Sequence, residues 1–297
     1  MNHPKYIKII LIQIVFCIMK YIDVVILTKD SMPTIKSTIE SLLSSDIPIN
    51  KIIFVDGYSK DGTLDYIKSL NKSLDIEIIL DDGNRATARQ KGIESVSTDW
   101  FMFLDSDVVL PTKWFKYAIK YMRRDVGAIW GTVINFSERA YYQYRFSKIF
   151  YKTSLIELFR LRGLQRGYTH DTLINLNAVR DIRIPSFLDT FEDHYIRLYI
   201  ERRGFKYIPA FPPYCIHVQE YRSPDVSQWY LNGFYGTILK FYSMKDVFKQ
   251  LSSGLMKLWI ILALTGKFNI GINQYKIHLY TSLGILKNLL GRRLSLE

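Results

Sequence analysis

Apolar strand patterns alternate strictly with helical patterns between residues 23 and 104 of this 297-residue chain. Short runs rich in Val, Ile and Phe are typical of buried strands, and apolar residues three or four apart are typical of helices. Strands are expected at residues 23–28, 51–55, 76–80 and 100–104, with helices at 33–43, 64–70 and 85–95. This alternation predicts an α/β fold with a mostly parallel central sheet and helices on its faces.

Acidic side chains follow three of the expected strands, at the points where the strand patterns end. Asp30 follows the first strand, Asp56 the second, and Asp105 and Asp107 the fourth. In parallel α/β sheets, ligands bind beyond the carboxyl ends of the strands. We therefore expect these carboxylates to converge on one crevice at that edge of the sheet.

The sequence Asp105-Ser106-Asp107 places two carboxylates one residue apart after a buried strand pattern. Side chains at i and i+2 point to the same side of an extended strand, and burying both carboxylates is costly without a cation nearby. A hard divalent cation binds carboxylate and phosphate oxygens together. The pair therefore suits a site that holds a diphosphate and stabilises it as a leaving group. An Asp-rich turn that binds no metal is the alternative.

The formal net charge of +12 indicates an anionic partner. Charge alone leaves nucleic acid, an anionic membrane surface and a phosphorylated substrate open. The chain has two cysteines, Cys17 and Cys215, which argues against a disulfide framework and against a zinc knuckle. Such cysteine usage fits a reducing compartment, so we expect a cytoplasmic location.

Three regions are expected along the chain: residues 1–19, 20–222 and 223–297. The first contains an apolar run at residues 6–19, which is interrupted by Lys8 and Gln13. This run is short for a spanning helix, which needs about 20 residues. A short membrane anchor, a signal peptide that lacks a small-residue cleavage site, and an extension ahead of a start at Met19 all remain open.

The third region is helical by pattern and rich in aromatic residues, Leu and Lys. Helices are expected at residues 226–251, 255–264 and 275–290, with a break at 266–273. An amphipathic helix lying on a membrane and a packed hairpin with a solvated basic face both fit this pattern. Basic residues beside aromatic ones, at 141–145 and 229–240, suit the headgroup region of a membrane. We therefore expect peripheral contact with the inner face of the membrane and a lipid-linked acceptor.

Four segments together resemble glycosyltransferase family 2, which has the GT-A fold. They are DVVILTKD at 23–30, IIFVDGYSKDGTLDYI at 52–67, DDGNRATARQKGIESVSTDWFMFLDSDVVLP at 81–111 and FEDHYIRLYIERRGFKYIP at 191–209. Their order and spacing also match, and the resemblance covers residues 22–218. It implies that residues 20–222 form a GT-A catalytic domain. It also implies inverting, metal-dependent hexosyl transfer from a nucleotide-sugar donor to a glycan or lipid-linked acceptor.

The resemblance also implies where the nucleotide and the metal bind. Thr28 and Asp30 match positions that line the nucleotide pocket, and Asp56 matches the acid that contacts the base or ribose. Many family members carry two consecutive acids at this turn, whereas Asp56 is followed by glycine here, so the base preference stays open. Asp107 and Asp105 match the D-x-D pair that binds Mg2+ or Mn2+, with Asp107 as the direct ligand and Asp105 facing ribose or metal-bound water.

Two arginines and one acidic pair complete the site that the family implies. Arg85 and Arg89 lie in a segment that often reads G-x-x-x-A-R-N, and a guanidinium grips phosphate oxygens well. A surface salt bridge is the alternative for Arg89. Glu192 and Asp193 match the family's E-D pair, in which the second acid is the general base that deprotonates the acceptor hydroxyl. Capping of a helix N-terminus is their alternative role.

His217 lies in a strand-like stretch after the acidic pair. In several GT-A enzymes a histidine near this point completes the metal shell, whereas a lone histidine on an apolar strand is more often a core residue. Two other function classes remain open. A nucleotidyltransferase needs a Gly-rich basic signature after the first strand, which residues 29–33 lack. A nucleic-acid-binding protein explains the basic charge but not the acids, which repel phosphate without a metal, so no nucleic-acid partner is expected.

Overall fold

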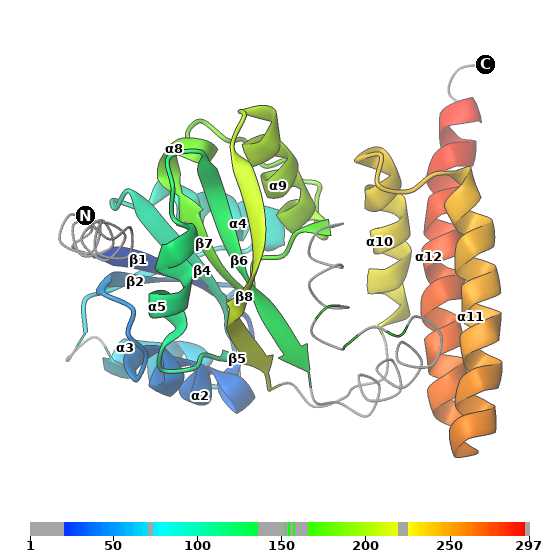
Figure 1. The fold of residues 1–297 in the computed structure, drawn as a ribbon, viewed down its shortest axis with the longest axis horizontal. Helices are drawn as coiled ribbons and strands as arrows, with labels where there is room; N and C mark the ends of the chain where they lie inside the picture. The colour runs from blue at the N-terminus through cyan, green and yellow to red at the C-terminus, as the bar shows by residue number, and fades with distance from the viewer. Residues whose placement is uncertain are drawn as a thin grey trace, which may run out of the picture.

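A computed structural model describes residues 21–70, 74–135, 152, 154, 157, 166–218 and 225–294 (Figure 1). The expected N-terminal extension at residues 1–19 and the basic aromatic segment at 141–145 lie outside the described residues. The strands are, in chain order, β1 (Ile22–Thr28), β2 (Ile49–Asp56), β3 (Ile76–Leu80), β4 (Trp100–Asp105), β5 (Val108–Val109), β6 (Val126–Asn135), β7 (Asp171–Asn175) and β8 (Lys206–His217). The helices are α2 (Met32–Leu43), α3 (Thr63–Leu70), α4 (Arg85–Glu94), α5 (Trp114–Ala118), α8 (Leu176–Val179), α9 (Glu192–Arg202), α10 (Val226–Ile238), α11 (Met244–Thr265) and α12 (Phe268–Leu294), with a short 3-10 helix at Ile119–Tyr121.

The described strands form one sheet in the order β3-β2-β1-β4-β7-β6-β8-β5. The first four are parallel, as the alternation predicts, with Thr28 beside Asp56 and Leu27 beside Asp105 in the register. All four carboxyl ends therefore reach the same edge of the sheet. The predicted α/β architecture, a mostly parallel sheet with helices on its faces and a helical C-terminal part, is confirmed (Figure 1).

The other half of the sheet is mixed, because β7 runs antiparallel to both β4 and β6. The sequence pattern does not predict β7, which is only five residues long. The strand β8 runs as a single strand through Pro212 and Pro213. A shift in its register with β6 between Gly131 and Thr132 accommodates this segment.

The sheet is buried on both faces, which explains why its strands read as continuous apolar runs. Successive strand residues point to opposite faces, so Val24 and Ile26 join one core and Val25 joins the other. The helices α2, α3 and α5 cover the first core, and α4, α8 and α9 cover the second. Each fully buried Ile or Phe contributes about 1.5–3 kcal/mol relative to exposure, and this packing holds the strand ends in place.

The C-terminal helices pack as a layer beside the sheet domain, with α12 in contact with both α10 and α11 (Figure 1). The expected helix at 226–251 is wrong, because α10 ends at Ile238 and a capping box at Ser243 starts α11. The expected break at 251–255 is also wrong, since α11 continues to Gly266, which has a positive φ. The break expected at 266–273 is shorter than predicted, because α12 already begins at Phe268. Among the described helices, α11 alone is long and apolar enough to span a membrane.

Candidate active site

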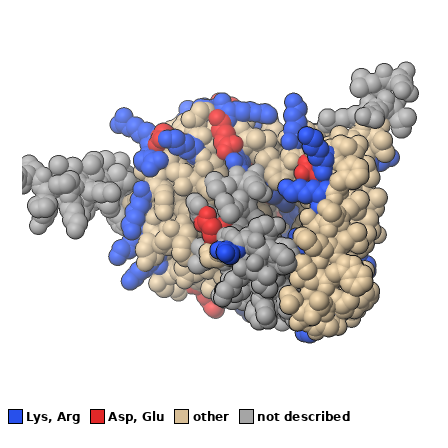
Figure 2. Space-filling view, turned by 45° about the vertical axis from the view of Figure 1, so that its right-hand side comes forward, with Lys and Arg blue, Asp and Glu red and all other residues tan. Residues whose placement is uncertain are grey.

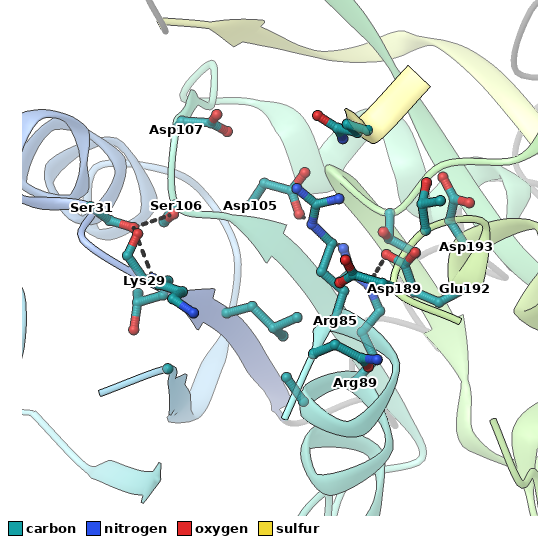
Figure 3. A pocket seen from close by; sticks show the side chains of 18 of the residues that line it. Lys29, Ser31, Arg85, Arg89, Asp105, Ser106, Asp107, Asp189, Glu192 and Asp193 are labelled. Atoms are coloured by element: carbon teal, nitrogen blue, oxygen red, sulfur yellow. Dashed lines mark hydrogen bonds and ion pairs between the residues drawn. The ribbon is translucent and has the colours of Figure 1, made fainter. Parts of the chain in front are cut away.

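The carboxyl ends of β1 and β4 face α9 and α10 across a cavity of about 1130 Å3. Figure 3 shows Asp105 and Asp107 on one side of this cavity and Glu192 and Asp193 on the other. Nine of the ten predicted site residues line it: Thr28, Asp30, Arg85, Arg89, Asp105, Asp107, Glu192, Asp193 and His217. The predicted convergence at one edge of the sheet is therefore present for all but one of these positions.

Asp56 is the exception, because its side chain is fully buried beneath the cavity wall. Its carboxylate accepts hydrogen bonds from the Thr28 hydroxyl at 2.7 Å, and from the Ser59 backbone amide and hydroxyl at 2.8 and 2.7 Å. These bonds fix the loop after β2. Asp81, at the end of β3, lines the cavity instead and pairs with Lys91 at 2.7 Å. The proposed contact between Asp56 and a base or ribose stays a prediction.

The loop that carries the D-x-D pair is tied to three neighbouring elements. The Asp105 amide donates to the His170 carbonyl at 2.8 Å, and the hydroxyls of Ser106 and Ser31 lie 3.0 Å apart. Asp107 Oδ2 lies 3.2 Å from His217 Nε2, because Val108 pairs with His217 in the β5–β8 ladder. Burial opposes the charge of His217, but the hydrogen bond with Asp107 and the nearby carboxylates raise its pKa above the ordinary value.

Arg89 links the end of β4 to the start of α9. Its guanidinium lies 3.2 Å from Asp105 Oδ1 and 3.4 Å from Glu192 Oε1, and it stacks 4.7 Å from the Phe103 ring centre (Figure 3). Arg89 is only 5% exposed, so it is not the surface salt bridge considered as its alternative role. Burial and the charge of Asp193 raise the pKa of Glu192, although Arg89 lowers it.

The acidic pair opens α9 directly after a strained residue. Phe191 has a φ of +70°, a left-handed conformation that costs a residue with a Cβ about 1–2 kcal/mol. Packing holds this conformation, since the Phe191 ring is fully buried and lies 4.1 Å from the Arg166 guanidinium. Asp193 Oδ1 accepts a hydrogen bond from the His194 amide at 2.7 Å and lies 3.5 Å from Arg166 Nε. Asp193 therefore has the helix-capping contact of its alternative role as well as a cationic partner.

Arg166 and α10 are parts of the cavity that sequence reasoning missed. Arg166 precedes β7 in a segment without a recognisable motif, so no local signal pointed to it. From α10, Gln228, Trp229 and Asn232 line the cavity. Asn232 Oδ1 accepts a hydrogen bond from Thr190 Oγ1 at 2.5 Å, which ties α10 to the loop before the acidic pair. The helical region is thus part of the site wall.

The side chains at the D-x-D loop suit a hard divalent cation only when a bound molecule supplies further ligand atoms. The described residues contain no group of three His, Cys, Asp or Glu side chains placed to hold a metal ion. Asp107 and His217 would offer one oxygen and one nitrogen ligand to such a cation, while Asp105 is paired with Arg89. A cation there would need further oxygens, and phosphate oxygens are the ligands that Mg2+ and Mn2+ commonly share with carboxylates.

The fold is that of the GT-A glycosyltransferases, judged by solved structures that superpose on most of the chain. The mannosyltransferase PcManGT from Pyrobaculum calidifontis, in complex with GDP-Man and Mn2+, matches with a TM-score of 0.60 and 12% identity, over 91% of this chain and 87% of that one. S. aureus TarS in complex with UDP-GlcNAc matches with a TM-score of 0.52 and 13% identity, over 91% of this chain and 92% of that one. At these identities the likeness shows the fold alone.

The family model described as glycosyl transferase family 2 matches residues 23–183, which is more than half of the chain. The chain therefore belongs to glycosyl transferase family 2, as the sequence motifs predict. Poly-beta-1,6-N-acetyl-D-glucosamine synthase from Staphylococcus epidermidis is 30% identical over 102 residues, which are 33% of this chain and 25% of that protein. The matched part thus spans about a quarter of the length of this curated relative.

Proposed function

We propose that the chain is an inverting glycosyltransferase that moves a sugar from a nucleotide-diphosphate sugar to an acceptor hydroxyl or lipid phosphate. Residues 20–222 form the catalytic domain, and residues 223–297 add a helical region whose first helix completes the site wall. The single observation that carries this proposal is the cavity, where the D-x-D loop and the pair Glu192-Asp193 face each other from opposite walls (Figure 3). An in-line displacement needs a leaving-group site and a base on opposite sides of the reacting carbon.

Asp193 is the general base in this proposal. It takes the proton of the acceptor hydroxyl while the new bond to the anomeric carbon forms and the bond from that carbon to the diphosphate oxygen breaks. The configuration at the anomeric carbon is thereby inverted. Arg166, 3.5 Å from Asp193, orients the carboxylate toward the cavity.

Arg85 is the arginine best placed to bind the donor's diphosphate. It is an exposed residue in the first turn of α4 and lines the cavity, whereas Arg89 is already engaged with Asp105 and Glu192. Backbone amides and the dipole at a helix N-terminus also favour phosphate. Arg89 then acts on the donor indirectly, by holding Asp105 toward the cavity.

Asp107 and His217 are the proposed protein ligands of a divalent cation, Mg2+ or Mn2+, with Asp105 beside them. When bound, such a cation neutralises charge on the departing diphosphate. Thr28, Asp30 and Asp56 support the nucleotide end of the cavity. The Mn2+ in the PcManGT complex supports the proposal by analogy of fold.

The acceptor is proposed to be a glycan or a lipid-linked molecule, and the enzyme is proposed to act in the cytoplasm at the inner face of the membrane. The partial match to a polysaccharide synthase supports a glycan acceptor. Family membership favours this function over the two alternatives, a nucleotidyltransferase and a basic nucleic-acid-binding protein.

Calorimetric binding of UDP, GDP and dTDP, each with Mn2+ and with a chelator, tests the proposal. We expect one nucleotide to bind in a metal-dependent way, and Asp107→Ala to abolish the metal dependence. Absence of binding to all three would contradict the proposed donor class. With the donor established, NMR of the product's anomeric carbon decides between inversion and retention, and a retained configuration would rule out the role of Asp193.

A further inference from the structure

The helix α11 carries an apolar face that its own protein leaves uncovered. Phe248, Leu255 and Trp259 lie seven and four residues apart, a spacing that places them on one side of a helix. Their exposed fractions are 71%, 46% and 66%, and Met256 beside them is also exposed. Figure 2 shows the surface of the C-terminal helices as a continuous area with few charged side chains. Monomeric soluble proteins rarely expose contiguous apolar surface of this kind without a partner.

The opposite side of α11 packs against α12, so the helix cannot be immersed in lipid all round. Gly254 packs so close to α12 that a Cβ there would lie 2.8 Å from His278 Cβ. His278 also holds polar side chains between the two helices, with Lys257 Nζ at 3.1 Å and Gln250 Oε1 at 2.5 Å from its ring nitrogens. A spanning orientation would place these polar groups at the depth of the hydrocarbon, which is costly.

The exposed charged residues beside the apolar face are basic. Lys245 and Lys249 are exposed at the start of α11, and Lys267 is exposed just beyond its end. The one acid in α11, Asp246, takes part in the capping box at its start, and from residue 247 to residue 296 the sequence has no Asp or Glu. A second copy of the chain docked symmetrically on this face would bring the same lysines together, and like charges at an interface oppose association. An anionic lipid surface attracts them instead, by about 1 kcal/mol for each basic residue near the surface.

We propose that the face of α11 formed by Phe248, Leu255, Met256 and Trp259 docks in the plane of an anionic lipid bilayer, with the lysines at the headgroups. The apolar side chains enter the boundary between headgroups and acyl chains, as in other in-plane helices. This proposal specifies the surface that makes the membrane contact of the proposed function, and it rests on that function. Because α12 also packs on α10, whose residues line the cavity, docking holds the active site close to the lipid surface.

Trp259 is 66% exposed, whereas Trp100, Trp114 and Trp130 are buried and Trp229 lies half-buried in the cavity wall. The part of the emission that Trp259→Phe removes therefore reports the environment of Trp259. The full chain is mixed with phosphatidylcholine vesicles, with or without phosphatidylglycerol. We expect a blue shift of tryptophan emission that requires the anionic lipid, weakens with added salt and is absent in Trp259→Phe. Lipids brominated near the headgroup should quench this emission more strongly than lipids brominated near the chain end.

The variant Phe248→Ser/Leu255→Ser should lower vesicle partitioning by about tenfold or more, because two exposed apolar side chains no longer enter the bilayer. The double variant Tyr21→Ser/Leu43→Ser is the matched control. The two side chains are 57% and 46% exposed, respectively, and lie in the sheet domain, just before β1 and at the end of α2. Vesicle binding without a response of Trp259 would overturn the proposal, as would equal binding of the two double variants.

A dimer that Phe248→Ser dissociates, in the absence of any lipid response, would assign the face to a second copy and also overturn the proposal. Stronger quenching from the chain end would assign a spanning orientation and overturn the in-plane one. No nucleotide or acceptor is present in these measurements, so their failure leaves the proposed transfer reaction unaffected. Failure of the nucleotide-binding experiment would equally leave the docking result unaffected.

Discussion

Replacing Asp171 by asparagine should change how the stability of the fold depends on pH. Asp171 lies on β7 with no exposed surface, and its Oδ2 accepts a hydrogen bond from Trp114 Nε1 at 2.8 Å. Burial raises the pKa of Asp171 to about 8, against the lowering effect of the bond from Trp114. Gly131 leaves the space that this carboxyl occupies, since a Cβ there would collide with it. The folded protein therefore holds the proton of Asp171 far more tightly than the unfolded chain does.

The sign follows from this difference in affinity. In the unfolded chain the carboxyl titrates near 3.8, and in the folded protein near 8. The stabilising contribution of the bound proton is complete below pH 3.8 and is lost as the pH rises toward 8. Between these values the free energy of unfolding should fall by about 1.4 kcal/mol per pH unit relative to a variant without this group. The asparagine side chain of the variant has no proton to release, and its carbonyl still accepts the bond from Trp114.

Melting temperatures of the wild type and Asp171→Asn, measured from pH 5 to pH 9, test the reasoning. The difference in melting temperature between the two proteins should change with pH, by about 2–4 °C for each kcal/mol, and should level off above pH 8. Any destabilisation by the amide itself is the same at every pH and does not alter this trend. Asp125→Asn is the control, because Asp125 is exposed and its pKa is held below the ordinary value by Lys206 and Arg123. If the melting temperatures of Asp171→Asn and the wild type changed with pH in parallel, Asp171 would be charged in the folded protein and the reasoning would be refuted.

Four further substitutions test the site. Asp193→Asn should abolish transfer while leaving calorimetric binding of the donor nucleotide intact, and near-normal turnover would exclude Asp193 as the base. Arg89→Met should lower the free energy of unfolding in urea by about 3–5 kcal/mol, because Glu192 stays buried without its partner. Adding Glu192→Gln should recover part of this loss, and an unchanged stability of Arg89→Met would contradict the buried pairing. Asn232→Ala should cost about 1–3 kcal/mol and reduce kcat more than it reduces donor binding, since Thr190 loses its partner. An unchanged kcat would show that α10 does not position the loop.

The parts of the fold and site that the sequence predicts are those that depend on local patterns. Parallel strands follow from apolar runs separated by helical spacing, and strand ends determine where Asp30, Asp105 and Asp107 lie. These three acids line one cavity for this reason, whereas Arg85, Arg89, Glu192 and Asp193, which also line it, lie in helices and were predicted from the family motifs. The same rule fails at Asp56, where hydrogen bonds to Thr28 and Ser59 turn the side chain inward. That outcome depends on tertiary hydrogen bonding, which the position of a strand end does not specify.

The features that were missed depend on contacts between distant segments. Arg166 meets Asp193 across 27 residues of chain, and neither residue carries a local signal for the other. No sequence pattern indicated which part of the helical region after residue 223 meets the site, and α10 forms part of the cavity wall through Asn232. The apolar periodicity near 239–243 continues across the turn, and Lys240 with a φ of +61° ends the helix there. The spacing of apolar residues indicates which face of a helix is apolar, but it does not indicate where the helix ends and the chain turns.

The charge balance of the cavity supports the proposal that the donor binds together with a further cation. Three carboxyl groups, those of Asp105, Glu192 and Asp193, are gathered within reach of two guanidinium groups, those of Arg89 and Arg166. These arginines are already committed to the protein's own acids, since Arg89 contacts two of them and Arg166 contacts the third. An incoming diphosphate brings additional negative charge to a poorly solvated site, where uncompensated charge is costly. Arg85, which lines the cavity, offsets part of this charge, and a divalent cation at the D-x-D loop would offset more of it without withdrawing an arginine from the acidic pair. Donor binding should therefore depend on metal even where the base and its partners are intact.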